Sequence, residues 1–188
     1  MKATATAPAN IAFIKYWGKA DLPRRSHAEV GEEPRIPLNS SISMNLSGAQ
    51  TTTTVEFSDS FAADDITLLG GVFSEKETAR VIAGLERIRR KERIASRARV
   101  VTQNTFPKGA GSAASASGFA ALTVAGFAAA DYSLSEKELT IVARIGSGSA
   151  CRSIPDGFVL WEAGSDSESS YAYSLYDSPH WDLRDILV

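Results

Sequence analysis

Apolar and polar residues alternate over much of the first half of the chain, which is the pattern of half-buried β-strands. Residues 41–47 carry an apolar side chain at every second position, and residues 51–57 are a β-branched run. The two segments predict a hairpin that turns at residues 48–50. Further strands are expected at residues 1–17 (strand, turn, strand), 66–73 (a second hairpin), 98–102, 157–161 and 170–176.

Helix starts are marked by the capping-box pattern, a serine followed three positions later by a glutamate. The pattern occurs at Ser74 with Glu77 and at Ser135 with Glu138, and it predicts helices over residues 74–93 and 135–143. Residues 113–130 are mostly alanine with serine, threonine and glycine between, so they are too weakly apolar for a membrane span. This segment therefore predicts a third, buried helix.

The order of these elements is strands, helix, strand, two helices, strands. It indicates an α+β fold, a mixed sheet packed on helices, rather than a regular βαβ series. Residues 1–181 are expected to form one ligand-binding domain. A new apolar run begins at residues 182–188, which we expect to be the start of a truncated C-terminal domain.

Charge and cysteine content narrow the choice of partner. The 188 residues include 20 Lys and Arg against 22 Asp and Glu, and a net charge of −2 gives no overall attraction to nucleic acid or to an anionic membrane. The basic run at residues 87–99 is therefore expected to be a solvated helix face. The single cysteine, Cys151, excludes an intrachain disulfide, fits a cytoplasmic location and is expected to be a packed thiol.

The strongest local signal lies at residues 104–118, where a glycine-rich turn joins a strand to the alanine-rich helix. Gly109 and Gly111 permit close approach of the backbone, and the free N–H groups of a helix start form a cradle for an anion. Ser112 and Ser115 add hydroxyl donors. The segment lacks the Gly-Lys-Ser/Thr of a Walker A loop. The alternative is a glycine- and alanine-rich helix start that packs tightly on a sheet.

Two other segments carry candidate chemistry. Residues 146–153 combine glycines and serines with Arg152, whose guanidinium suits a carboxylate or a phosphate. The alternative is a Ser/Gly turn with a surface arginine. Lys15 and Lys19 lie four positions apart around two aromatic residues, which alone favours an aromatic core anchor with solvated lysines.

In order along the chain, these segments resemble one family. Residues 7–19, 37–43 with 51–54, 104–118 and 146–153 are similar to mevalonate diphosphate decarboxylases, which belong to the GHMP kinase superfamily. The resemblance implies the GHMP-kinase N-terminal fold. It also implies an enzyme that uses ATP and Mg²⁺ to phosphorylate the 3-hydroxyl of a mevalonate phosphate, and then releases phosphate and CO₂ to give isopentenyl diphosphate.

The resemblance also implies roles for particular residues. Catalytic roles fall on Lys15, Ser115 and Arg152, with Arg152 binding the substrate carboxylate. Substrate contacts fall on Tyr16, Lys19, Ser147, Ser149 and Arg152. The ATP phosphates would meet Lys108, Gly109, Ala110, Gly111, Ser112, Ala113 and Ser115. No protein metal site is expected, because Mg²⁺ would arrive with ATP.

The phosphate loop departs from the family pattern, since Lys108 and Gly109 replace Thr-Ala and Ser112 replaces Leu. The family's catalytic aspartate lies in its C-terminal half and is not expected in this chain, which alone should not turn over. Three alternatives stay open: a decarboxylase of the monophosphate, a mevalonate 3-kinase that retains the CO₂, and a non-catalytic anion-binding or dimerising module. A homodimer is also left open.

Overall fold

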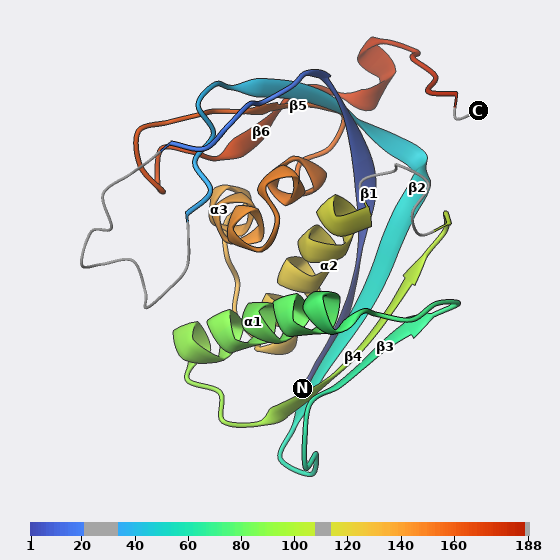
Figure 1. Ribbon diagram of the computed structural model, residues 1–188, viewed down its shortest axis with the longest axis vertical. Helices are drawn as coiled ribbons and strands as arrows, with labels where there is room; N and C mark the ends of the chain where they lie inside the picture. Colours follow the sequence, from blue (N-terminus) through green and yellow to red (C-terminus); the bar gives the residue numbers. More distant parts are fainter. Residues whose placement is uncertain (21–33, 108–113, 187–188) are drawn as a thin grey trace.

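The protein is described by a computed structural model that covers residues 1–20, 34–107 and 114–186 (Figure 1). Its fold is α+β, as the sequence predicted. The elements in chain order are β1 (Lys2–Ile14), β2 (Ser41–Ser58), β3 (Asp65–Leu69), α1 (Glu75–Glu92), β4 (Arg97–Asn104), α2 (Ala114–Ala129), α3 (Glu136–Gly146), the 3₁₀ helix η1 (Gly148–Ser153), β5 (Phe158–Trp161), β6 (Ala172–Tyr176) and the 3₁₀ helix η2 (Ser178–His180).

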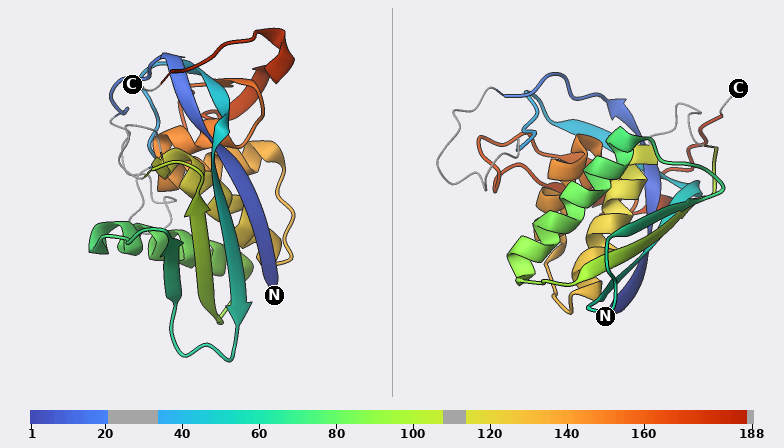
Figure 2. Two further views of the ribbon diagram at one scale, coloured as in Figure 1. Left: turned by 90° about the vertical axis from the view of Figure 1, so that its right-hand side faces the viewer. Right: turned by 60° about the horizontal axis from the view of Figure 1, so that its bottom comes forward.

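The long strand β2 organises the sheet. On one side it pairs with β1 along its length, and on the other it pairs with β5 at its beginning and with β4 at its end. The strand order is β3-β4-β2-β5-β6, and β3 and β4 form a parallel pair in an otherwise antiparallel sheet. The three α-helices cover one face of this sheet (Figures 1 and 2).

The two faces of the sheet differ in chemistry. In β2 the buried positions Thr51, Thr53, Val55 and Phe57 alternate with less buried ones, as a strand with one covered face requires. On the outer face, hydroxyl groups pair across β1 and β2, with Thr4 Oγ1 2.8 Å from Thr54 Oγ1 and Thr6 Oγ1 2.9 Å from Thr52 Oγ1. The apolar core therefore lies between the sheet and the helices.

The predicted helices are confirmed. The side chains of Ser74 and Ser135 accept hydrogen bonds from the main-chain N–H groups of Glu77 and Glu138, so both capping boxes form. Helix α2 lies in the middle of the helical layer, and most of its residues are buried. None of the helices in the described ranges has the length and apolar character that crossing a bilayer needs.

The predicted hairpins were wrong. Residues 41–57 belong to the single strand β2, because the expected turn at residues 48–50 is a bulge: Pro8 faces Gln50 while Ala9 faces Leu46. Residues 1–17 likewise contain one strand, β1, rather than two, because β1 stays paired with β2 on both sides of this bulge. Only β3 forms within the second predicted hairpin, since its partner is the parallel strand β4. Residues 182–186 contain neither helix nor strand.

The expectation of a solvated basic face was wrong at two positions. Arg87 and Arg89 are 8% and 5% exposed. Arg89 forms a two-point ion pair with Asp64, and its Nε donates to the Ser96 carbonyl oxygen at 3.0 Å. Burial is tolerated because the charge has a carboxylate partner and its N–H groups are satisfied.

Candidate anion-binding site

The centre of the candidate site is Arg152, which η1 carries into the interior, where it is 3% exposed. Its Nη1 donates to Ser41 Oγ at 2.5 Å, and its Nε and Nη2 donate to Asn10 Oδ1 at 3.4 and 3.2 Å. Asn10 is itself fixed, because its Nδ2 donates to Ser153 Oγ at 2.8 Å and to the Ser149 carbonyl oxygen at 3.1 Å. Strands β1 and β2 therefore hold the guanidinium in one orientation.

Two aromatic rings form the walls around this guanidinium. Arg152 Cζ lies 5.5 Å from the ring centroid of Tyr16 and 5.6 Å from that of Trp161, within cation–π range. The two rings meet edge to face with centroids 4.7 Å apart. Trp161 is fully buried, and its Nε1 donates to Ser170 Oγ at 3.1 Å.

The charge of Arg152 has no acidic counterpart in the described part of the chain. Burial lowers the pKa of its guanidinium, and the neighbouring Cys151 and Tyr16 only partly oppose this effect. In Arg89, by contrast, a carboxylate compensates the buried charge. A buried arginine held by neutral oxygens is poised to bind an anion, because an anion supplies the missing charge compensation.

Cys151, next to Arg152, is a packed thiol as the sequence predicted. It is fully buried, and its Sγ donates to the Gly148 carbonyl oxygen at 3.1 Å. Burial raises the pKa of this thiol to about 12, although the nearby arginines act in the opposite direction. A group with this pKa is not a nucleophile at neutral pH.

The arginine pocket continues toward the start of α2. Ser147 Oγ donates to Ser115 Oγ at 3.4 Å, which brings the turn after α3 against the first turn of α2. Ser115 is exposed there, in the first turn of α2. The first N–H groups of a helix have no partner within the helix, and such a helix end suits an anion. Gly148 packs closely at this junction, because a Cβ would lie 3.1 Å from the Tyr16 hydroxyl oxygen.

A cavity of about 100 Å³ lies beside Ser115, between α1, α2 and the sheet. Its wall is mostly apolar, and the polar groups include Arg80, Asn104 and Ser115. The first turn of α2 thus forms part of the cavity lining, through Ala114 and Ser115. Among the described residues no group of three His, Cys, Asp or Glu side chains could hold a metal ion.

The segment that carries Lys15 and Lys19 follows β1 and is anchored by Asn39. Asn39 Oδ1 accepts from the Trp17 N–H at 3.0 Å, and Asn39 Nδ2 donates to the Lys15 carbonyl oxygen at 3.0 Å. Both lysines are exposed. The ammonium group of Lys15 forms no hydrogen bond or ion pair with any described residue, so it is free to meet a ligand.

The structure therefore brings together five of the residues chosen from sequence: Tyr16, Ser115, Ser147, Ser149 and Arg152. Lys15 and Lys19 lie on the adjoining segment. The predicted ATP contacts at residues 108–113 (Lys108, Gly109, Ala110, Gly111, Ser112 and Ala113) lie outside the described residues.

Sequence reasoning missed Asn10, Ser41 and Arg80. The first two lie within the segments singled out above. The signal for Asn10 was a polar residue inside a strand that is otherwise apolar or small, whereas Ser41 gave none, because polar residues alternate with apolar ones through residues 41–47. Arg80 gave no such signal, because an arginine in an amphipathic helix is normally solvated.

Fold and site together define a class: an α+β domain with a buried arginine, held by neutral oxygens, beside the start of a helix. A family model described as the diphosphomevalonate decarboxylase-like N-terminal domain matches residues 7–172. The chain belongs to this family.

Relatives support the same assignment. The chain is 39% identical to human diphosphomevalonate decarboxylase over 202 residues, covering 98% of this chain and 47% of the relative. It is 38% identical to the enzyme from Aspergillus fumigatus, covering 100% of this chain and 48% of the relative. The chain thus spans about half the length of the curated relatives it matches.

Solved structures agree. The mevalonate diphosphate decarboxylase from Enterococcus faecalis superposes with a TM-score of 0.80 at 43% identity, over 91% of this chain and 50% of that one. The structure named MDDEF in complex with MVAPP, AMPPCP and magnesium has the same TM-score and identity, over 91% of this chain and 49% of that one. The enzyme from Trypanosoma brucei has a TM-score of 0.78 at 36% identity, over 96% of this chain and 47% of that one.

Proposed function

We propose that this chain forms the ATP- and substrate-binding part of an enzyme that decarboxylates mevalonate 5-diphosphate to isopentenyl diphosphate, a step of isoprenoid biosynthesis. The observation that supports this proposal most directly is Arg152. It is buried and held by Asn10 and Ser41, and no described carboxylate neutralises it. The carboxylate of mevalonate diphosphate would supply the missing negative charge.

The proposed reaction uses that pairing for orientation. ATP with Mg²⁺ supplies the phosphoryl group that turns the tertiary 3-hydroxyl into a leaving group. When the C3–O bond breaks, its electron pair leaves with phosphate, and the electrons of the bond between C2 and the carboxylate carbon form the new double bond as CO₂ departs. Arg152 would hold the carboxylate so that this bond is aligned with the emptying orbital at C3.

The remaining residues are assigned to the diphosphate of the substrate and to the place where the substrate meets the nucleotide. We assign the diphosphate end of the substrate to Tyr16, Lys19, Ser147 and Ser149, and the junction between nucleotide and substrate to Ser115. Lys15 would line the same pocket. The domain division at residue 181 and a catalytic aspartate in a second half of the enzyme are also part of this proposal. We expect a cytosolic enzyme.

The test is to measure release of ADP and of CO₂ from carboxyl-labelled mevalonate diphosphate by the complete enzyme. Equal release of both supports the decarboxylase. ADP without CO₂ would indicate a 3-kinase, and faster turnover of the monophosphate would indicate the other decarboxylase branch. Release of neither product would contradict the proposal and favour a non-catalytic anion-binding module.

A further inference from the structure

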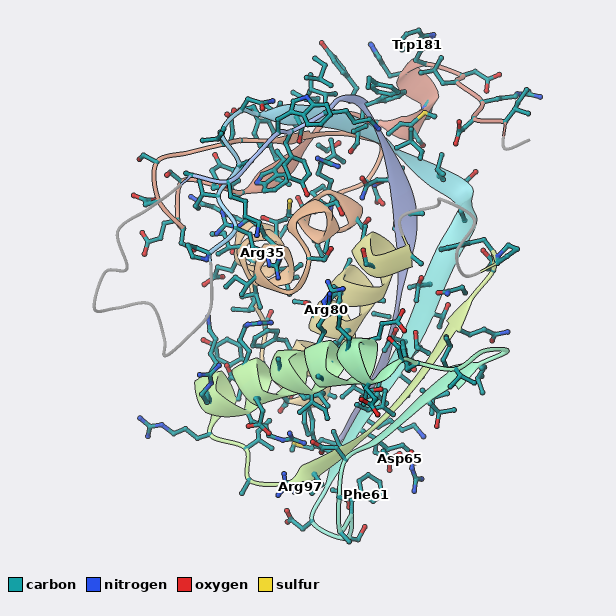
Figure 3. All side chains as sticks on the ribbon, viewed as in Figure 1. Arg35, Phe61, Asp65, Arg80, Arg97 and Trp181 are labelled. Atoms are coloured by element: carbon teal, nitrogen blue, oxygen red, sulfur yellow. The ribbon has the colours of Figure 1, made fainter. Side chains whose placement is uncertain are left out.

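Trp161 packs against Arg152 and Tyr16 without reaching the surface. Its ring centroid lies 5.6 Å from Arg152 Cζ and 4.7 Å from the centroid of the Tyr16 ring. The far end of the indole packs on η1, because a Cβ on Gly148 would lie 3.3 Å from Trp161 Cη2. Trp181 lies at the outer edge of the molecule (Figure 3), whereas Trp161 is fully buried. Trp161 can therefore act on a ligand only through its neighbours.

The nitrogen end of the indole is fixed by Ser170, which is 0% exposed. Ser170 Oγ accepts from Trp161 Nε1 at 3.1 Å and donates to the Glu162 carbonyl oxygen at 2.9 Å. The main-chain N–H of Ser170 donates to the Asp166 carbonyl oxygen at 3.2 Å, and the Ser170 carbonyl oxygen accepts from Arg144 Nη1. Every hydrogen-bonding group of Ser170 thus has a partner, and a buried network whose members are all satisfied is rigid.

The support of the indole extends to α3. Residues 162–171 connect β5 to β6, and Arg144 of α3, which is 0% exposed, anchors this connection. Besides its bond to Ser170, Arg144 donates from Nη2 to the Ser167 carbonyl oxygen at 3.1 Å and to Ser167 Oγ at 2.8 Å. The connection also packs on itself, because a Cβ on Gly164 would lie 2.6 Å from the Ser170 main-chain nitrogen. It is therefore a rigid support for Trp161.

The rigid indole limits the space that the Arg152 guanidinium can occupy. Side-chain oxygens on β1 and β2 accept from the guanidinium nitrogens, and the Trp161 ring packs beside them. We propose that Trp161 is a positioning residue: with its indole fixed by Ser170, its ring keeps the Arg152 guanidinium in the orientation that meets the substrate carboxylate. This inference rests on the proposed function. It makes residues 162–171, which lie outside the family-like segments, part of the catalytic arrangement.

The competing explanation is that Ser170 only stabilises the fold, as a buried and hydrogen-bonded hydroxyl does. Thr140 of α3 supplies the matched control. It is also 0% exposed, and its Oγ1 accepts from the Ala172 N–H at 3.1 Å and donates to the Lys137 carbonyl oxygen at 2.8 Å. Ser170→Ala and Thr140→Val each remove one buried hydroxyl with one accepted and one donated hydrogen bond. They should therefore lower the midpoint of urea unfolding by similar amounts, while only Ser170→Ala releases the indole N–H.

In the complete enzyme, Ser170→Ala is expected to lower kcat/KM for mevalonate diphosphate by roughly 10- to 100-fold, the effect of slightly misplacing a group that orients the substrate. Trp161→Phe, which keeps a ring but loses the indole N–H, should give a loss of the same order, and Thr140→Val should turn over like the wild type. In an Arg152→Met background, Ser170→Ala should change kcat/KM by no more than about twofold, because the group on which Trp161 acts is gone. An undiminished loss in that background, or Trp161→Phe at the wild-type rate, would overturn the inference.

Nuclear magnetic resonance spectra of this chain, labelled with ¹⁵N, measure the orientation of Arg152 without turnover. The nearby aromatic rings shift the Arg152 Nε–H resonance by an amount that depends on how the rings are oriented. Ser170→Ala should move this resonance and speed exchange of the Trp161 indole N–H with solvent, whereas Thr140→Val should leave both as in the wild type. That result with an enzyme that releases no CO₂ would support the positioning role while the proposed function fails. Active enzyme whose Arg152 resonance is unmoved by Ser170→Ala would contradict the positioning role and leave the proposed function standing.

Discussion

Replacing Arg152 by methionine should separate function from stability. In the proposed complex the guanidinium makes two charge-assisted hydrogen bonds to the substrate carboxylate, each contributing about 1.5–3 kcal/mol. Losing both removes about 3–6 kcal/mol of transition-state stabilisation. The expected loss in kcat/KM is therefore roughly 10²- to 10⁴-fold.

Stability should respond much less, because two effects oppose each other. Methionine leaves Asn10 Oδ1 without its donors, which costs about 1–3 kcal/mol. It also removes a buried, uncompensated charge whose desolvation costs several kcal/mol, and it packs on Tyr16 and Trp161. The free energy of unfolding should change by no more than about 2 kcal/mol.

The assays are coupled ADP and CO₂ release by the complete enzyme and urea unfolding of the chain. Arg144→Met is the matched control, because Arg144 is fully buried, holds the carbonyl oxygens of Ser167 and Ser170, and, unlike Arg152, has a carboxylate, that of Asp166, acting on its charge. Leaving those two oxygens without donors should cost about 2–6 kcal/mol. Decarboxylation by Arg152→Met at the wild-type rate, or destabilisation as large as that of Arg144→Met, would refute the reasoning.

Three further predictions concern other charged groups. Asn10→Asp places a protein carboxylate beside Arg152, where it competes with the substrate carboxylate for the guanidinium, so KM for the substrate should rise at least about tenfold. An unchanged KM would exclude this competition. Burial alone would raise the pKa of Asp64, but the hydrogen bonds from Arg89 and Ala98 lower it below 3.8. The ionised carboxylate therefore stabilises the folded protein at neutral pH, and this contribution is lost as the pH falls through the lowered pKa. Asp64→Asn should therefore cost about 3 kcal/mol at pH 7 in urea unfolding, with a smaller difference from wild type in strong acid; a difference independent of pH would contradict this. Cys151, with a pKa of about 12, should react with iodoacetamide at pH 8 about a thousandfold more slowly than a free thiol until the protein is unfolded, and rapid labelling of the native chain would contradict its burial.

The sequence predicted best what short-range interactions decide. The starts of α1 and α3 follow from Ser74 and Ser135, because a capping box needs only residues within one turn. The hairpins failed because a bulge looks like a turn unless the partner strand is known. Gly48 lies within β2, because β1 pairs with β2 both before Gly48, at Leu46, and after it, at Gln50.

The same division applies to the site. Arg152 lies in a cluster of glycines and serines, so the sequence indicated it. Arg35 and Arg80 bind carbonyl oxygens 110 and 66 positions away, and no local pattern reports such a contact. Arg89 was wrongly predicted to be solvated, because its partner Asp64 lies 25 positions earlier and the local sequence does not reveal this ion pair.

The paired threonines on the outer face of β1 and β2 have an evolutionary consequence. Threonine combines a branched Cβ, which suits an extended backbone, with a hydroxyl that bonds to its neighbour or to water. Sequence drift should therefore be accepted at positions 52 and 54 and rejected at positions 55 and 57, whose side chains are 0% and 1% exposed. Within six residues of one strand, a library of variants would pass from its most permissive sites to its most restrictive ones.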